Sequence, residues 1–233
     1  MRHPTGELAA LPNVTLLKLD VTDPAEIQSV VHDVESETPV DVVMNNAGYA
    51  LMGALEGLSD DQIMDQLNTN VMGTIRVTKA FLPYFRERKK GLFLNVTSTT
   101  VLLPDPFLSV YSASKGAIET WSAAMRSELS KVGIGIKTIM PDLMNTRLVA
   151  NAKLELHPAY LHWTDKILEK FNTPGAFPID QPAEVAPFIY EAAIDESDKL
   201  QYLVGNNAIQ AGAAIEKYGV NAVRAEKERY LFS

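Results

Sequence analysis

Short apolar runs alternate with longer amphipathic stretches along the whole chain. The apolar runs are rich in leucine, valine and isoleucine, a composition typical of strands that are buried on both faces of a parallel sheet. They lie at residues 14–19, 40–44, 92–97, 135–140 and 201–206. Between them, apolar residues recur at helical spacing, most clearly from Asp60 to about Arg86. This alternation predicts an α/β fold with a doubly wound parallel sheet.

Length and composition fit a single domain spanning residues 1–233. The chain is 46% apolar and is long enough to bury one substantial core. It has no cysteine, which excludes disulfides and thiolate metal sites and is typical of a reducing cytoplasm. Its net charge of −8 argues against a nucleic-acid partner, and no apolar stretch approaches the ~18 residues of a membrane span. We expect a cytoplasmic protein with no metal, nucleic-acid or membrane partner.

A tyrosine and a lysine one helical turn apart indicate proton-transfer chemistry. Tyr111 and Lys115 share one face of the helix expected at residues 111–131, and Ser98 closes the strand expected at 92–97. An ammonium within ~4–6 Å would lower the pKa of the phenol, ~10 when unperturbed, by ~1–3 units. Because ligands of open α/β sheets bind at the carboxyl ends of the strands, the Ser98 hydroxyl is placed to hydrogen-bond the reacting oxygen. Tyr111 would exchange a proton with a substrate hydroxyl or carbonyl.

The same spacing also occurs by chance on amphipathic helices, where the tyrosine is usually a packing residue. Further motifs fall in a fixed order around the pair, and coincidence does not explain that order. They are Asn45-Asn-Ala-Gly48, Asn70-Val-Met-Gly73, Ser98 and Pro141-Asp-Leu-Met-Asn-Thr146. From about residue 14 to the C-terminus, the set resembles the short-chain dehydrogenase/reductase family, which implies a Rossmann-like doubly wound parallel sheet.

The resemblance implies a catalytic tetrad of Asn70, Ser98, Tyr111 and Lys115. Tyr111 would be the acid/base, and Ser98 would orient the substrate. Lys115 would hold the ribose hydroxyls of the cofactor and tune the tyrosine, while Asn70 would anchor a water in the proton relay. The implied reaction interconverts a carbonyl and a secondary alcohol by hydride transfer, with NAD or NADP as cofactor.

The same resemblance implies residues that contact the cofactor along the sheet. Besides Tyr111 and Lys115, they are Asp20, Val21, Asn46, Ala47, Gly48, Pro141 and Thr146. Asp20 and Val21 would contact the adenine, Asn46 to Gly48 would line the adenosine side, and Thr146 would hold the carboxamide. Without the resemblance, Asp20 merely terminates a strand, and the asparagines with Gly48 form an ordinary turn.

Two positions depart from the family pattern. The residue after Pro141 is usually glycine, where the backbone passes close to the nicotinamide, and here it is Asp142. Its carboxylate would crowd the ring or change its electrostatics. Met144 stands where the family has valine or isoleucine, which is a milder change.

The phosphate-binding signature of the family, TGxxxGxG after the first strand, does not occur in this sequence. We therefore expect a Rossmann-like sheet that lacks its first two strands, with a gap beside residues 40–44. Three hypotheses address this gap. The strand at 14–19 moves into the vacant position beside 40–44, protomers exchange strands, or the sequence begins at an internal methionine of a longer enzyme.

The segment 143–179 corresponds to the variable substrate lid of the family. Within it, the helix expected at residues 159–172 has an apolar face, which favours a small substrate with a hydrophobic part or simply packs the lid onto its own domain. The helices expected at 60–86 and 111–131 resemble the dimerisation face of the family and predict a homodimer or homotetramer. A set of residues on the second helix could equally form an internal core stripe: Ala113, Ala117, Trp121, Ala124 and Met125.

Two function classes remain. In the first, the chain is an NAD(P)-dependent oxidoreductase that acts through Tyr111 and Ser98. In the second, it is a non-catalytic protein that keeps the fold and the tetrad, has lost cofactor binding, and serves an interaction role. The tetrad favours the first class, whereas the missing glycine-rich turn and Asp142 favour the second.

Overall fold

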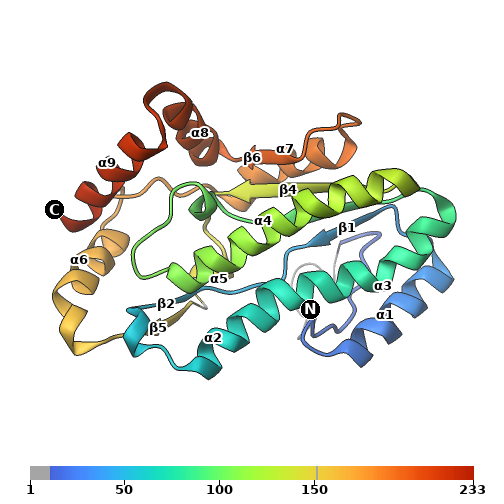
Figure 1. Ribbon diagram of the computed structural model, residues 1–233, viewed down its shortest axis with the longest axis horizontal. Coiled ribbons are helices and arrows are strands. Elements are labelled where there is room, and N and C mark those ends of the chain that lie inside the picture. Colours follow the sequence, from blue (N-terminus) through green and yellow to red (C-terminus); the bar gives the residue numbers. More distant parts are fainter. Residues whose placement is uncertain (1–10, 151) are drawn as a thin grey trace.

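The computed structural model describes residues 11–150 and 152–233, which form one layered α/β body (Figure 1). A parallel sheet of four strands runs through its centre in the order β1-β3-β4-β6. The predicted α/β fold with a parallel sheet is confirmed. In chain order, the helices and strands are α1 (Pro24–Glu37), β1 (Val42–Asn45), β2 (Leu51–Gly53), α2 (Asp60–Leu67), α3 (Gly73–Arg88), β3 (Leu92–Val96), α4 (Ser109–Leu129), β4 (Gly135–Pro141), α5 (Arg147–Ala150), β5 (Lys153–Glu155), α6 (Leu161–Asn172), α7 (Pro182–Ile194), β6 (Gln201–Val204), α8 (Asn206–Tyr218) and α9 (Val220–Phe232).

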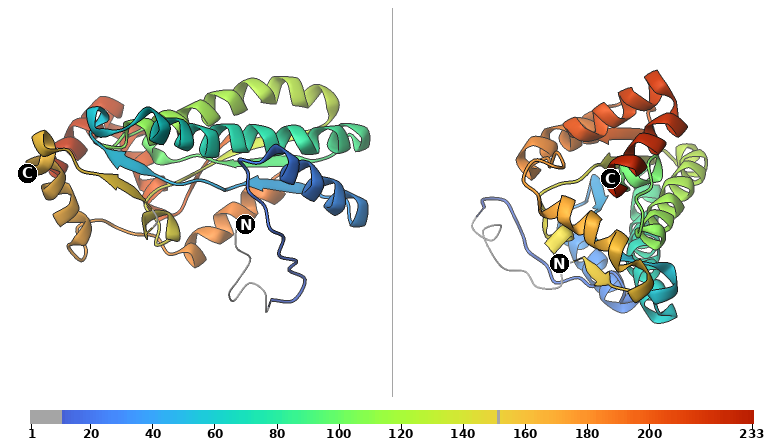
Figure 2. Two further views of the ribbon diagram at one scale, coloured as in Figure 1. Left: turned by 90° about the horizontal axis from the view of Figure 1, so that it is seen from below. Right: turned by 90° about the vertical axis from the view of Figure 1, so that its left-hand side faces the viewer.

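Helices cover both faces of the sheet, as the edge-on view in Figure 2 shows. On one face, α1, α3 and α4 pack around Phe85 and Phe93, which are fully buried. On the other face, Val185 and Ala192 of α7 meet Leu94 of β3. None of the described helices is long and apolar enough to cross a bilayer. Four of the five expected strands correspond to β1, β3, β4 and β6.

The first long helix of the sequence prediction is interrupted by a wider turn. α2 begins with a capping box, in which the Gln62 N–H donates to Ser59 Oγ and the Ser59 N–H donates to Gln62 Oε1. After α2, Asn68–Met72 form a π-helical turn before α3 continues. Such turns occur frequently at functional sites. This one carries Asn70, a member of the predicted tetrad.

The prediction of a strand at residues 14–19 is wrong. No strand forms at residues 14–20, and Val14 and Leu17 are exposed. The segment leads into a turn in which the Asp23 N–H donates to the Asp20 carbonyl (3.1 Å), and Figure 2 shows it leaving the sheet. Apolar and β-branched residues favour extended backbone, but a strand also needs a partner to complete its hydrogen bonds. The local sequence does not report whether that partner exists.

The hypothesis that this segment fills the gap beside β1 is also wrong. Among the described strands, β1 pairs with β3 alone, so the sheet ends at β1 within this part of the chain. Val42 and Met44 of β1 are exposed, whereas Val43 and Asn45 are buried. Strand exchange between protomers stays a prediction.

A row of polar side chains crosses one buried face of the sheet. Asn45 Nδ2 of β1 donates to Asn95 Oδ1 of β3 (2.8 Å), and Asn95 Nδ2 donates to Ser122 Oγ of α4 (2.9 Å). Thr138 Oγ1 of β4 (2.9 Å) and Gln201 Nε2 of β6 (2.7 Å) both donate to Glu119 Oε1 on α4. The row therefore fixes α4 over the sheet. Its members are neighbours in register: Asn45, Asn95, Thr138 and Gln201.

We expect Asn95→Ala to lower the free energy of unfolding by about 1–3 kcal/mol, because the buried Asn45 amide loses an acceptor and Ser122 loses a donor. Urea denaturation of both proteins measures the difference. The matched control is Asn145→Ala, since the exposed Asn145 amide donates to Gln181 (3.0 Å) at the surface. That substitution should cost less than about 0.5 kcal/mol. Equal losses in the two variants would show that the row adds nothing to stability.

The predicted lid segment, residues 143–179, pairs with the rest of the chain at its two ends and through β5. Met144 near its start pairs with Asp180 just beyond its end in an isolated parallel bridge. Within the segment, β5 pairs in parallel with β2, a two-stranded sheet that the sequence did not predict. The helix expected at 159–172 is confirmed as α6, which follows a short 3₁₀ turn at Pro158–Tyr160.

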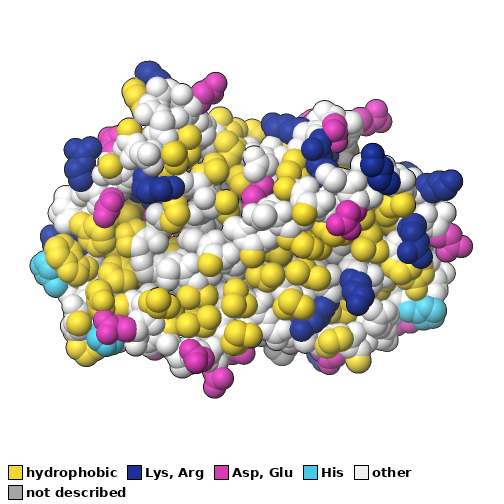
Figure 3. Space-filling view, viewed as in Figure 1, with side chains coloured by type: hydrophobic (Ala, Val, Ile, Leu, Met, Phe, Trp, Pro, Cys, Tyr) yellow, Lys and Arg dark blue, Asp and Glu magenta, His cyan; other side chains and the backbone are white. Residues whose placement is uncertain are grey.

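The outer face of α3 and α4 is apolar. Figure 3 shows hydrophobic side chains gathered along the middle of this face. Ala113, Ala117 and Ala124 are exposed, so these three do not form an internal core stripe. Trp121 and Met125 are partly buried and do pack against the core. Self-association through this face stays a prediction.

Candidate active site

The four residues of the predicted tetrad gather at the carboxyl end of the sheet. Ser98 follows β3, Tyr111 and Lys115 lie in the first turns of α4, and Asn70 lies in the π-helical turn before α3. All four are buried, with exposed fractions between 2% and 7%. Their placement does not test the predicted roles of these residues. The predicted proton transfer does require that they lie close together.

Tyr111 has a raised pKa in this structure. Burial is the largest cause of the raised pKa, the charge of Asp105 adds to it, and a hydrogen bond with the Ser98 side chain partly offsets both. The Lys115 ammonium lies 5.8 Å from the centre of the Tyr111 ring. The sequence predicted that Lys115 would lower the pKa of this phenol, whereas here the pKa is raised and Lys115 is not among the groups that shift it. The phenol is consequently held protonated at neutral pH.

Lys115 is buried with no carboxylate at ion-pair distance among the described residues. Its Nζ donates to the Val96 carbonyl at the end of β3 (2.8 Å). Burial lowers the pKa of Lys115 to about 8, because a low-dielectric surrounding disfavours the ammonium. An ammonium has three donors, so this side chain has hydrogen-bonding capacity beyond the carbonyl that it binds.

Asn70 ties three parts of the site together. Its Nδ2 donates to the Tyr49 carbonyl (3.0 Å) and to Ser114 Oγ (3.0 Å), and its Oδ1 accepts from the Tyr49 N–H (3.1 Å). Ser114 Oγ in turn donates to the Tyr111 carbonyl (2.7 Å). Both amide donors of Asn70 are therefore used within the protein, and its predicted role in holding a water stays a prediction.

Gly48 lies where these groups converge. A Cβ atom on Gly48 would lie 3.0 Å from Asn70 Oδ1 and 3.7 Å from Lys115 Nζ. Glycine thus lets the loop after β1 pass close to both side chains. Asn46 and Ala47, which were predicted to line the adenosine side, are exposed at the entrance to this loop.

Asp20 and Val21, the predicted adenine contacts, form part of a turn before α1. Asp20 Oδ1 accepts hydrogen bonds from the Thr22 N–H (2.9 Å) and hydroxyl (2.8 Å). Val21 packs against the start of α3, where a Cβ on Gly73 would come within 2.7 Å of Val21 Cγ2. The turn therefore lies against the same helix that begins beside Asn70, although no strand precedes it among residues 11–20.

The segment after β4 explains the departure from the family glycine. Pro141 is buried at the end of β4, and Asp142 Oδ1 accepts a hydrogen bond from Thr99 Oγ1 (2.9 Å). The carboxylate thereby joins this segment to the residue after Ser98. Met144 packs against the core beneath α7. Thr146 Oγ1, the predicted carboxamide contact, accepts from the Leu148 N–H (3.3 Å) at the start of α5.

The cluster fits the nicotinamide and ribose half of a dinucleotide. The buried Lys115 has donors for ribose hydroxyls, and Gly48 keeps the neighbouring loop free of a side chain. The pyrophosphate half has no counterpart in the described part of the chain, where no glycine-rich turn follows a strand and opens a helix.

Sequence reasoning missed residues that support the cluster. Ser114 lies within the Tyr111–Lys115 motif, and its small polar side chain on the buried face of α4 was the available signal. Asp105, in the loop before Tyr111, forms an ion pair (2.6 Å) with Lys227 of α9. No sequence pattern brings together two residues that are so far apart along the chain.

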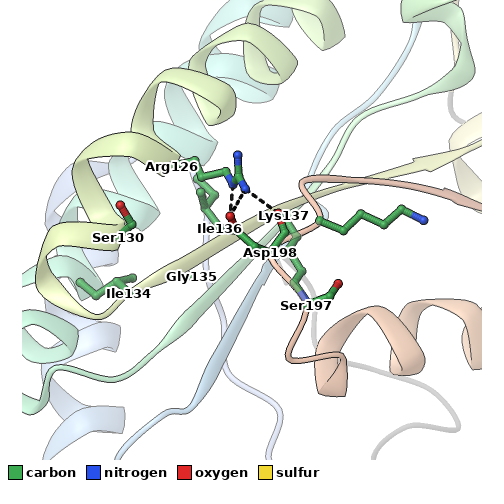
Figure 4. A pocket seen from close by; sticks show the side chains of 9 residues that line it. Arg126, Ser130, Ile134, Gly135, Ile136, Lys137, Ser197 and Asp198 are labelled. Atoms are coloured by element: carbon green, nitrogen blue, oxygen red, sulfur yellow. Dashed lines mark hydrogen bonds and ion pairs between the residues drawn. The ribbon is translucent and has the colours of Figure 1, made fainter.

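A pocket at the opposite end of the sheet carries no comparable chemistry (Figure 4). It lies at the start of β4, where Arg126 Nε donates to Asp198 Oδ1 (3.2 Å) and closes one wall. Lys137 donates to the Ala192 carbonyl at the end of α7 (3.0 Å). Both cations are thus engaged with the protein. In the described residues, no group of three or more histidine or acidic side chains could hold a metal.

Comparison with known proteins agrees with this geometry. A family profile described as short chain dehydrogenase matches residues 3–156. An uncharacterised oxidoreductase of Schizosaccharomyces pombe is 33% identical over 214 residues, which cover 90% of each chain. A solved short-chain dehydrogenase from Streptomyces avermitilis is 30% identical, has a TM-score of 0.75, and is aligned over 96% of this chain and 81% of its own.

A short chain dehydrogenase from Burkholderia cenocepacia, solved in complex with NADP, has the same fold. Its TM-score is 0.71 at 19% identity, over 93% of this chain and 79% of its own. The profile match extends over more than half of the present sequence. The chain belongs to the short-chain dehydrogenase family, and its class is that of the oxidoreductases.

Proposed function

We propose that the protein is an NAD(P)-dependent oxidoreductase that interconverts a carbonyl and a secondary alcohol with Tyr111 as acid/base. The observation that carries this proposal is the buried cluster of Tyr111, Ser98 and Lys115 at the carboxyl end of the sheet. Membership of the family and the NADP held by the Burkholderia structure support a nicotinamide cofactor. When bound, that cofactor supplies or accepts the hydride.

Each residue of the cluster has a separate part in holding or moving the proton. The raised pKa of Tyr111 keeps the phenol protonated, so that it can donate to the oxygen of a carbonyl that is being reduced. The Ser98 hydroxyl binds the same oxygen and orients it. The Lys115 ammonium, 5.8 Å from the centre of the Tyr111 ring, would favour the tyrosinate that remains.

Aromatic side chains in the loop before α4 and in the predicted lid segment favour a small substrate with an apolar part. Phe107, in the loop before α4, meets Tyr160 of the predicted lid segment edge to face at 6.1 Å. Within the same segment, Phe171 and Phe177 stack at 4.7 Å. Aromatic side chains of this kind offer large apolar contact areas to a ligand.

A non-catalytic role is the second candidate. The observation that favours it is that the described residues include no glycine-rich turn for a pyrophosphate. In this role the protein would act through its surface, and the apolar outer face of α3 and α4 is suited to self-association. We propose that this face forms a homodimer or homotetramer in either role.

Separate titrations with NADH and NADPH, followed by nicotinamide fluorescence, decide between the two candidates. We expect saturable binding of at least one, and oxidation of the bound coenzyme when small apolar ketones are added. Lys115→Met should weaken this binding, because Lys115 is the predicted ribose contact. Lys131→Met is the matched control, since Lys131 is exposed beyond the end of α4. If neither NADH nor NADPH binds, the result favours the non-catalytic role.

A further inference from the structure

The helix α9 is attached to the loop that joins Ser98 to Tyr111. Lys227 Nζ of α9 donates to the Leu103 carbonyl (3.2 Å), and Arg224 Nη2 donates to the Leu102 carbonyl (3.2 Å). In Figure 1, α9 lies between α8 and the predicted lid helix α6. Two cations of one helix therefore bind neighbouring carbonyls of the loop that connects the two hydroxyls of the candidate active site.

The far end of α9 is held independently of this loop. Lys166 Nζ of α6 donates to the Phe232 carbonyl (3.0 Å), and the rings of Trp163 and Phe232 meet edge to face at 5.5 Å. The Tyr230 hydroxyl donates to the Ala176 carbonyl (2.6 Å). Because these contacts do not involve Lys227, the helix keeps its place when that one side chain is changed.

Lys227 also makes an ion pair with a carboxylate of the same loop. Its Nζ lies 2.6 Å from Asp105 Oδ1, and the two side chains are only 27% and 24% exposed. Burial raises the pKa of Asp105, while Lys227 opposes that rise. The charge of Asp105 in turn acts on Tyr111, as its contribution to the raised pKa of the phenol shows.

The charged groups around Tyr111 come from four parts of the chain. Lys115 belongs to α4 itself, Asp105 belongs to the preceding loop, and Asp142 follows β4 and interacts with Asp105. Lys227 and Arg224 face the loop from α9. Of the two cations on α9, Lys227 is paired with the carboxylate that acts on the phenol, whereas Arg224 donates to a backbone carbonyl.

We propose that Lys227 is a positioning residue for Tyr111: it holds Asp105 in an ion pair in the loop that leads to the phenol and thereby sets how readily the phenol ionises. This inference rests on the proposed function, since it assumes that Tyr111 is the acid/base. With Lys227 present, the field of the carboxylate is partly cancelled. Without it, the full negative charge would oppose formation of the tyrosinate.

The test is the pH titration of Tyr111 by NMR of the full chain carrying isotope-labelled tyrosine, with the resonance assigned through Tyr111→Phe. Asp105→Asn should lower the pKa of Tyr111, and Lys227→Met should raise it, each by about half a unit to one unit. Lys227→Arg should restore the value of the unchanged protein. Arg224→Met is the matched control, because it removes a neighbouring contact between α9 and the loop without removing the ion pair, and it should cause no shift.

A second readout is the pH dependence of kcat/KM for alcohol oxidation. The apparent pKa of this profile should be lowest in Asp105→Asn and highest in Lys227→Met, as in the NMR titrations. Equal titration of the unchanged protein, Asp105→Asn and Lys227→Met would overturn the inference. So would an Arg224→Met shift as large as that of Lys227→Met, because loosening of the helix would then explain both. Full turnover by Tyr111→Phe would instead refute the proposed function, while the order of the NMR titrations would still stand.

Discussion

Tyr111→Phe is expected to lower the rate of carbonyl reduction by about 10²–10⁴-fold, because it removes the proton donor and nothing else. The phenylalanine ring fills the same buried space. Of the groups that shift the pKa of Tyr111, only the Ser98 side chain is hydrogen-bonded to the hydroxyl that is lost. We therefore expect an intact fold and saturable coenzyme binding, weakened at most by the loss of the one predicted contact that the Tyr111 hydroxyl makes. Steady-state kinetics should show the loss in kcat, and nicotinamide fluorescence should show that binding is retained.

Tyr202→Phe is the matched control for this substitution. Tyr202, on the edge strand β6, is also buried, and its hydroxyl donates to Asp195 Oδ2 (2.5 Å). Its removal should cost about 1 kcal/mol of stability and leave kcat unchanged. If Tyr111→Phe kept the rate of the unchanged protein, or if the control lost as much activity, Tyr111 would not be the acid/base.

Lys115→Met is expected to raise the free energy of unfolding at neutral pH by about 2 kcal/mol. The shift of the Lys115 pKa from 10.5 to about 8 corresponds to a burial penalty of about 3 kcal/mol. The substitution removes that penalty, but it also removes the hydrogen bond to the Val96 carbonyl, which offsets about 1 kcal/mol of the stability gained. The same substitution removes the predicted ribose contact, so the more stable protein should bind coenzyme less well.

The pH dependence of this difference follows from the direction of the shift. Lys115 has a lower pKa in the folded protein than in the unfolded chain, so the unfolded chain binds more protons between pH 8 and 10.5. The unchanged protein therefore gains stability relative to Lys115→Met as the pH rises through this window. Urea denaturation at several pH values measures it, with Lys131→Met as the exposed control. A stability difference that did not vary with pH would contradict the lowered pKa.

Local patterns predicted most of the fold and the gathering of the site. In a parallel sheet the carboxyl ends of all strands lie on the same side. A serine after one strand and a tyrosine at the start of the next helix must therefore lie near each other. Ser98 and Tyr111 follow that rule, and α6 follows its apolar spacing. These inferences needed only the order of the elements.

Partners and environments could not be predicted in the same way. Residues 14–19 have the composition of a strand, yet a strand depends on a neighbour that composition does not describe. The pKa of Tyr111 depends on how deeply α4 packs, and the spacing to Lys115 says nothing about that depth. Asn95 lies within the apolar run at 92–97, and its spacing does not reveal that it belongs to a polar row that spans the sheet.

The attachment of α9 has a consequence for how the protein folds. The bond from Lys227 to Leu103 joins residues that are 124 positions apart, and contacts of such long sequence separation are slow to form. During synthesis, Ser98 and Tyr111 leave the ribosome long before the helix that completes their surroundings. Early folding intermediates should thus contain both hydroxyls in place while the loop between them still exchanges its amide hydrogens with solvent.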